Sequence, residues 1–471
     1  MKSYSPELAY YCLFLVSLWL SGTLLEELLQ CRLLGELLIG IVFGNLGSLL
    51  PEDKSTLILA GEVGVLGLIF EAGLGTDIHK ILRAGPRGTL VALIGTIVPL
   101  ATGFGFISAI VKFPSLQDPD PEKPISVKTE ALASGAALAS TSIACAIATM
   151  KQRGMLETPL GTLITTAAMI DDVVSLVLLS IVSGIGNLAS GEETGSGIEP
   201  MTIIQPIVAS LGIIAFGFIA CNVAAKFHGW RSSTQVVGLP TEQTPEQEPE
   251  QEYTSTSISE YEAKETCETN EVRKTKSRRS AVQSRAILVY KTFAPTIKLA
   301  TMIITGFGFS ILTEYLGSSR LLGAFVAGVF FSSFHSLKAL YDENIEHKLQ
   351  PAMSAIFFAT IGFAIPLTKI LDPTLFGWGI AYTVIASFSK LITAVLVPSS
   401  PQPADGRRQR SNDRWVVGTA MIARGELGLL MVQQALLQGV MGESVMIVTT
   451  WSIVLCTLIG IGALGFVMNR A

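Results

Sequence analysis

The stretch TPLGTLITTAAMIDDVVSLVLLSIVS, residues 158–183, decides the class of fold. It is apolar apart from a few hydroxyl groups and two adjacent carboxylates, Asp171 and Asp172, near its middle. A helix needs about 20 predominantly apolar residues to cross the roughly 30 Å hydrocarbon core of a membrane. The stretch therefore predicts a membrane-spanning helix that carries two acids in the membrane interior.

The rest of the chain has the same apolar character. Of its 471 residues, 49% are hydrophobic and 15% are charged, whereas a soluble domain carries about 25% charged residues. The apolar stretches are continuous rather than alternating, which disfavours a transmembrane β-barrel. We predict an all-α polytopic membrane protein with about thirteen transmembrane helices, near residues 7–25, 33–50, 57–76, 88–111, 131–150, 159–186, 203–225, 292–316, 319–334, 352–371, 375–397, 415–437 and 443–468.

Charges in the loops orient these helices. With the N-terminus outside, the inside loops carry 13 Lys and Arg residues and the outside loops carry 7, the long linker left aside. Lys and Arg accumulate in cytosolic loops, so we expect an outside or lumenal N-terminus and a cytosolic C-terminus, in the plasma membrane or an endomembrane. Alternatively, the first apolar run, from Ala9 to Leu20, is a signal peptide preceded by Lys2.

A polar segment from Arg231 to Ser284 interrupts the apolar pattern. It is rich in Glu, Thr, Ser, Gln and Lys, and such a composition cannot bury enough apolar surface to fold. We expect a disordered cytosolic linker over 226–285, between an N-terminal membrane half (1–225) and a C-terminal membrane half (286–471). Its basic end, Arg273–Arg279, leaves contact with anionic lipids or control by phosphorylation open.

The two membrane halves resemble each other. LLGELLIGIVF at Leu33–Phe43 matches LLGAFVAGVFF at Leu321–Phe331 with an offset of 288 residues. IFEAGLGTDI at Ile69–Ile78 matches IFFATIGFAI at Ile356–Ile365 with an offset of 287. Matched spans lie seven apart, an odd number, so they cross the membrane in opposite directions. Inverted repeats of this kind are typical of secondary transporters, whose substrate site lies between the halves.

Charged groups deep in the spans are the candidate functional residues, because each costs roughly 2.5–3.5 kcal/mol on insertion. Asp171 and Asp172 are the strongest candidates. Two adjacent carboxylates cannot cheaply both be ionised there, so one keeps its proton unless a cation is near. Such a site can exchange protons for a small cation. The remaining deep or intermediate charges are Lys390, Arg424, Glu426 and Glu71.

Small and polar residues interrupt two spans that hold equivalent places in the repeat. ALASTSIACA brings Ser140 and Thr141 to the middle of one span, and MIARGELGLL brings Arg424 and Glu426 to the middle of the other. We predict two broken, crossing helices whose ends hold ions or charges. Ordinary helix–helix hydrogen bonding is an equal alternative for the hydroxyls. We interpret Arg424 and Glu426 as structural charges that compensate a broken helix end, with Glu71 one candidate partner of Arg424.

Read along the chain, the motifs LLGELLIGIVFG, STS, MIDD, FFATIGF and ARGELG resemble those of the monovalent cation:proton antiporter superfamily. The resemblance is to its second branch, which holds bacterial and fungal sodium- or potassium-proton exchangers. It extends from about Leu33 to Phe466 and omits the linker. It implies the inverted-repeat antiporter fold, with a moving core domain, a scaffold domain that dimerises, and hence a homodimer.

The resemblance also implies roles for single residues. Asp172 corresponds to the aspartate that binds the transported Na⁺, K⁺ or proton. Asp171 corresponds to its partner, which pairs with Lys390 in electrogenic relatives. Thr141, next to Ser140, corresponds to a hydroxyl at the helix crossing. Glu71 stands where bacterial members usually have an apolar residue.

The leading hypothesis is therefore a secondary antiporter that exchanges a monovalent cation for protons by alternating access. A cation channel or a non-transporting pH or ion sensor on the same scaffold is the alternative. No nucleophile–base pair or metal-binding set is apparent, and the four histidines fall in loops. We therefore expect neither an enzyme nor a bound cofactor. With a net charge of −5 and no basic domain, a nucleic-acid partner is not expected either.

Overall fold

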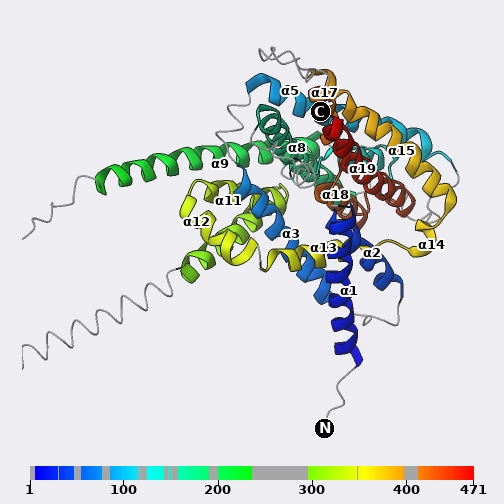
Figure 1. Ribbon diagram of the computed structural model, residues 1–471, viewed down its shortest axis with the longest axis horizontal. Helices are drawn as coiled ribbons and strands as arrows, with labels where there is room; N and C mark the ends of the chain where they lie inside the picture. Colours follow the sequence, from blue (N-terminus) through cyan, green and yellow to red (C-terminus); the bar gives the residue numbers. More distant parts are fainter. Residues whose placement is uncertain are drawn as a thin grey trace, which may run out of the picture. The chain divides into compact units, whose positions relative to one another are not determined.

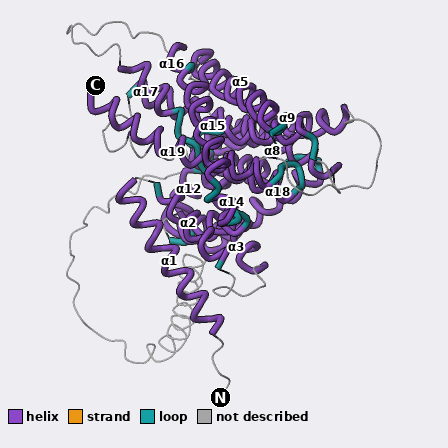
Figure 2. Tube along the Cα trace, turned by 90° about the vertical axis from the view of Figure 1, so that its right-hand side faces the viewer, coloured by secondary structure: helices purple, strands orange, loops and turns teal. Residues whose placement is uncertain are grey.

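The structure of the protein is a computed structural model, which describes residues 6–29, 31–46, 55–76, 85–113, 116, 125–142, 147, 150, 158–189, 200–235, 295–346, 348–396 and 412–470. Every regular element within these ranges is a helix, as Figure 2 shows. The all-α prediction is confirmed.

Among the described residues, eight helices are long and apolar enough to cross a membrane: Ala9–Leu29, Ser55–Gly75, Gly88–Ile110, Leu160–Ile185, Ile204–Val223, Pro295–Tyr315, Pro373–Leu396 and Glu443–Met468. Three shorter apolar helices accompany them, namely Arg320–Ser332, Gln350–Phe363 and Glu426–Leu437. The protein is therefore a multi-pass membrane protein. The number thirteen stays a prediction, because helices this short do not reach across the hydrocarbon core unaided.

The chain divides into two units. One comprises Met1–Ile219 and Thr305–Ala471, and the other comprises Ala220–Ile304. α9 (Pro200–Gln235) continues ten residues beyond the predicted start of the linker at 226. The rest of the predicted linker, from 236 to 285, lies outside the described residues. The helices of the first unit form two bundles.

One group of helices in this unit holds both matched pairs of the repeat, and we call it the repeat bundle (Figure 1). Its members are α1 (Pro6–Leu29), α2 (Arg32–Asn45), α3 (Ser55–Gly75), α11 (Arg320–Ser332) and α13 (Gln350–Phe363). The short helices α12 (His335–Tyr341) and η2 (Asp342–Glu346) connect α11 to α13.

Glycines allow the helices of the repeat bundle to touch backbone to backbone. A Cβ added at Gly40 of α2 would collide with the carbonyl oxygen of Ala359 in α13. A Cβ added at Gly328 of α11 would collide with the carbonyl oxygen of Phe70 in α3. Gly40 and Gly328 are 288 residues apart, which is the offset of the first sequence match. Matched glycines thus make matched contacts, and close packing through small residues is how helices associate inside membranes.

The second group of helices combines segments from both membrane halves, and we call it the crossing bundle (Figure 1). It consists of α5 (Gly85–Ile110), α6 (Val127–Ala139), α8 (Pro159–Ala189), α15 (Pro373–Leu391), α16 (Thr393–Leu396), α17 (Asn412–Ala420), α18 (Glu426–Leu437) and α19 (Glu443–Arg470). The buried hydroxyl of Ser134 lies 3.0 Å from that of Tyr382 and 2.7 Å from that of Thr449. These hydrogen bonds join α6, α15 and α19. The two bundles meet where α8 contacts α11 and where α18 contacts α13.

Candidate functional site

Two interrupted helices cross in the middle of the crossing bundle. α6 ends at Ala139, and residues 140–142 continue in a non-helical conformation. α17 ends at Ala420, and α18 begins at Glu426 after a second non-helical stretch. The amide of Ser142 donates a 2.9 Å hydrogen bond to the carbonyl of Ala423, so the two interruptions touch. The predicted pair of broken, crossing helices is confirmed.

Arg424 lies buried at this crossing and donates to two backbone carbonyls. Its guanidinium is fully buried and donates to the carbonyl of Ser140 at 3.1 Å and to that of Ala386 at 3.2 Å. Ser140 follows the last residue of α6, where the helix leaves carbonyl groups without intrahelical partners. A cation is favourable at this end of a helix dipole. The hydroxyl of Thr457 in turn donates to the carbonyl of Arg424.

Asp171 of α8 lies beside the crossing, and both of its oxygens accept hydrogen bonds. Thr96 of α5 donates to Oδ1 at 2.5 Å, and Thr141 donates to Oδ2 at 2.5 Å. Lys390 of α15 places Nζ 3.2 Å from Oδ2 and donates to the Thr141 hydroxyl at 2.7 Å. Asp171 and Lys390 are both completely buried. The structure thus brings together three of the predicted site residues, Thr141, Asp171 and Lys390.

Asp172 differs from its neighbour. It is 9% exposed, and within the described part of the chain no hydrogen bond or ion pair reaches its carboxylate. One turn further along α8, the fully buried hydroxyl of Ser175 also has no partner among the described residues. The adjacent acids therefore have different surroundings, because Asp171 accepts from three donors and Asp172 from none within the described part of the chain.

Glu426 and Glu71 take up separate positions. Glu426, the first residue of α18, accepts a 3.3 Å hydrogen bond from the hydroxyl of Ser142 at the crossing. Glu71 of α3 has Asp342 and Glu346 as its charged neighbours. The pKa of Tyr341 is raised above its ordinary value, mainly because the side chain is buried and secondly because the Glu71 carboxylate is near. The structure does not bring Glu71 to Arg424, because α3 turns this carboxylate toward α12 and η2, away from the crossing.

Sequence reasoning missed Thr96, although it donates directly to Asp171. Threonines in apolar helices commonly bond to a carbonyl of the preceding turn, as Thr102 does on the same helix. The Thr96 hydroxyl also lies 2.9 Å from the carbonyl oxygen of Ala92, so its single hydrogen is shared between this carbonyl and Asp171. Nothing in the local sequence distinguishes the two threonines, so no signal was available.

The chain resembles known proteins in both sequence and fold. A family profile described as "Sodium/hydrogen exchanger, transmembrane" matches residues 13–242 and 283–469. The chain belongs to this family. The match covers both membrane halves and breaks within the polar linker.

Individual relatives of this exchanger are distant but similar in length. The chain is 22% identical over 428 residues to a Na⁺/H⁺ antiporter of Enterococcus hirae, covering 90% of this chain and 88% of that one. It is 24% identical over 454 residues to the Na⁺/H⁺-K⁺ antiporter GerN of Bacillus cereus, covering 95% and 92% respectively.

A solved structure shares the fold of the exchanger. The sodium proton antiporter MjNhaP1 of Methanocaldococcus jannaschii superimposes with a TM-score of 0.60 at 13% identity, over 98% of each chain. Because the identity is so low, this match concerns the arrangement of helices. The predicted inverted-repeat antiporter fold and the predicted family are both confirmed. Within the described residues of the exchanger, no group of three or more His, Cys, Asp or Glu side chains is placed to hold a resident metal ion.

Proposed function

We propose that the protein is a secondary antiporter that exchanges a monovalent cation for protons, with Asp172 as the group that binds each in turn. The observation that carries this proposal is the unequal pair in α8. Asp171 already accepts from Thr96, Thr141 and Lys390. Asp172, immediately beside it, accepts no hydrogen bond from any residue that the structure describes. A carboxylate in that situation needs a cation or a proton as a partner, since an isolated buried charge is very costly.

The exchange follows from this requirement. Asp172 holds a proton when no cation is present, and it releases that proton when a dehydrated cation takes its place. The two occupants exclude each other on one carboxylate, so inward movement of one species is tied to outward movement of the other. The non-helical stretch Ser140–Ser142 borders the acids, because the Thr141 hydroxyl in it donates to Asp171. In transporters with broken helices, the unwound segments contribute to the site of the transported ion.

The site has the location that alternating access requires. The carboxylates and the crossing lie within the crossing bundle, while the glycine-packed repeat bundle forms a separate body of close contacts. We infer that the crossing bundle is the moving core and the repeat bundle is the scaffold, as the family resemblance implies. The names of the relatives, Na⁺/H⁺ antiporter and Na⁺/H⁺-K⁺ antiporter, support the cation class.

Topology and assembly are part of the same proposal. The distribution of Lys and Arg in the loops supports an outside or lumenal N-terminus, with the linker and the C-terminus in the cytosol. The resemblance supports a homodimer formed through the scaffold. Cross-linking of the purified protein in bilayers, compared with its mass in detergent, tests the dimer.

Proteoliposomes that contain a pH-sensitive dye test the transport function. Adding Na⁺, K⁺ or Li⁺ to vesicles with an acidic interior should dequench the dye in a saturable manner, and reversing the pH gradient should reverse the flux. Asp172→Asn should abolish this response and still elute as a folded protein on size exclusion. Glu443→Gln is the matched control, since Glu443 is a half-exposed acid paired with Lys369. Normal flux in Asp172→Asn would overturn the site, and non-saturable flux would indicate a channel.

A further inference from the structure

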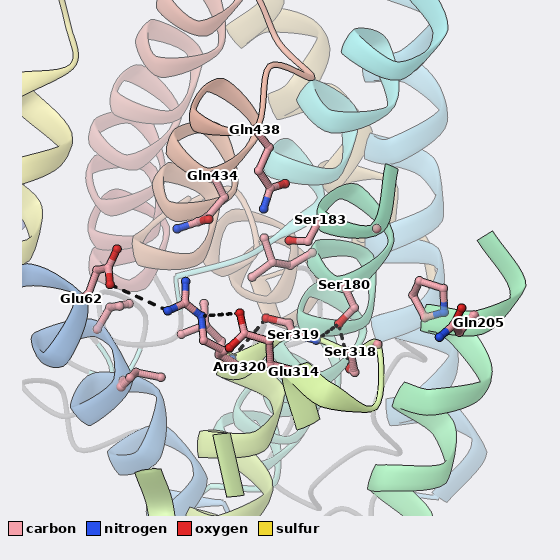
Figure 3. A pocket seen from close by; sticks show the side chains of 17 residues that line it. Glu62, Ser180, Ser183, Gln205, Glu314, Ser318, Ser319, Arg320, Gln434 and Gln438 are labelled. Carbon is pink, nitrogen blue, oxygen red and sulfur yellow. Dashed lines mark hydrogen bonds and ion pairs between the residues drawn. The ribbon is translucent and has the colours of Figure 1, made fainter. Parts of the chain in front are cut away.

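A cavity of about 430 Å³ lies at the seam between the two bundles. Figure 3 shows its wall from the repeat bundle, with Glu62 on α3 and Arg320 on α11. Its wall from the crossing bundle carries Ser183 on α8, Gln434 on α18 and Gln438 directly after α18. The tight turn after the helix Pro295–Tyr315 closes one side. The proposed mechanism has so far used none of these residues.

The cavity lies on the same face of α8 as Asp172. Leu179 and Ser183 of α8 line it, and they follow Asp172 by seven and eleven residues. Those spacings are close to two and three full turns, so the three residues share one face of α8, with roughly 10 Å of rise from Asp172 to Leu179. Gln434 lies eight residues after Glu426 on α18, a rise of about 12 Å. Ser175, whose hydroxyl has no hydrogen-bond partner among the described residues, lies between Asp172 and the cavity along α8.

The charges of the cavity are all on one wall. Arg320 Nε lies 3.4 Å from Glu314 Oε1, and Arg320 Nη1 lies 3.8 Å from Glu62 Oε2. Two carboxylates share one guanidinium, which leaves a net charge of −1. The opposite wall carries uncharged oxygens, and the amide oxygen of Gln438 is buried without a donor among the described residues. Uncharged oxygens together with one net negative charge suit a partly hydrated monovalent cation.

We propose that this cavity is a cation-binding vestibule on the path to Asp172, and that Arg320 sets its affinity by offsetting half of the charge of Glu62 and Glu314. The inference rests on the proposed antiport function and deepens it. In the orientation given above, the vestibule opens to the outside. A cation would enter between the carboxylates of Glu62 and Glu314 on one side and the side chains of Gln434 and Gln438 on the other. The hydroxyls of Ser183 and Ser175 would then replace part of its water shell before it reaches Asp172.

The location of the charges makes the effect one-sided. Glu62, Glu314 and Arg320 belong to the repeat bundle and its adjoining helix, so they do not travel with Asp172 when the crossing bundle moves. They therefore act on a cation only while the site is open to this side of the membrane. One unit charge at roughly 10 Å, screened between water and a protein surface, changes cation affinity by about two- to four-fold. Salt should reduce this effect, because the Debye length falls to about 3 Å at 1 M.

Cation-dependent proton flux should be measured in right-side-out and inside-out membrane vesicles made from the same cells. Arg320→Gln should lower the apparent KM for Na⁺ or K⁺ about two- to four-fold when the cation is supplied on the vestibule side. Glu62→Gln should raise that KM by a similar factor. Both shifts should be absent from the opposite side and should vanish when an impermeant salt raises the ionic strength to about 1 M. Arg320→Lys keeps the charge and should retain the wild-type KM.

Lys369→Gln is the matched control, because Lys369 is a half-exposed base on the same side that pairs with Glu443 at 2.5 Å, away from the cavity. It should show the wild-type KM from both sides. Equal shifts from both sides, shifts that persist at high salt, or an unshifted KM in Arg320→Gln and Glu62→Gln would each overturn the vestibule. Each of these results is compatible with normal exchange by the wild-type protein, so each would contradict the vestibule alone. Absence of exchange in the wild-type protein would instead overturn the proposed function.

Discussion

Lys390 and Asp171 form an ion pair of 3.2 Å in which neither side chain has any exposure to solvent. Lys390 lies on α15 and Asp171 on α8, and the two residues are 219 positions apart in the chain. A buried ion pair is costly to desolvate, and it is tolerated when further hydrogen bonds satisfy its members. Here Thr96 and Thr141 complete the set.

Lys390→Gln should reduce the charge moved in each transport cycle. The substitution keeps a donor for Thr141 but removes the positive charge beside Asp171. Each net elementary charge that the cycle moves across the whole membrane is driven by about 2.3 kcal/mol per 100 mV. Currents from proteoliposomes on a solid-supported membrane measure this response, with Lys369→Gln as the control. An undiminished current would remove Lys390 from the mechanism.

Arg424→Gln should lower the free energy of unfolding by about 2–5 kcal/mol, because two hydrogen bonds from a charged donor to buried carbonyls are lost. Those carbonyls belong to Ser140 and Ala386, on two different helices. Thermal unfolding in detergent, followed by tryptophan fluorescence, provides the measurement. Arg320→Gln is the comparison, since Arg320 is 45% exposed and its ion pairs are worth at most about 1 kcal/mol. Equal midpoints for the two variants would show that Arg424 does not stabilise the crossing.

Thr96→Val should slow exchange and lower the free energy of unfolding by about 1.5–3 kcal/mol, because Asp171 Oδ1 loses its donor. Thr102→Val is a close control, as Thr102 lies on the same helix and bonds to the carbonyls of Val98 and Pro99. Exchange assays and thermal unfolding on both variants decide the matter. If both behave as the wild type, Thr96 has no role in the site.

Gly40→Ala and Gly328→Ala should each lower the free energy of unfolding by about 1–3 kcal/mol, because the added methyl group overpacks a helix contact. In both cases the obstacle is a backbone carbonyl of the facing helix, which cannot rotate away. Gly308→Ala is the control, since no atom lies within 4 Å of its added Cβ. A helical Gly→Ala change without a clash gains up to about 1 kcal/mol. Thermal midpoints that rank the three variants otherwise would contradict the packing of the repeat bundle.

Much of the fold could be predicted from the hydrophobicity and charge of single sequence segments. The hydrophobic stretches predicted helices over nearly the observed ranges, since the cost of a charge inside a membrane acts on each stretch independently. The sequence also predicted both interruptions, one at Ser140–Ser142 and one at Arg424–Glu426, and in the structure the second ends at Gly425. The repeat was also visible, because Gly40 and Gly328 occupy matching positions in matching motifs.

The amino-acid sequence alone specified the class of protein, the two broken helices and the acids that do not belong in a membrane. The partner of each charge was decided only when the helices packed. Arg424 binds the carbonyls of Ser140 and Ala386 rather than Glu71. Asp171 accepts a hydrogen bond from a threonine 75 residues away, whereas among the described residues none bonds to Asp172 next to it. The physical reason is that hydropathy and charge are properties of a single segment, whereas a hydrogen bond depends on the rotation and crossing of two segments, which no single segment encodes.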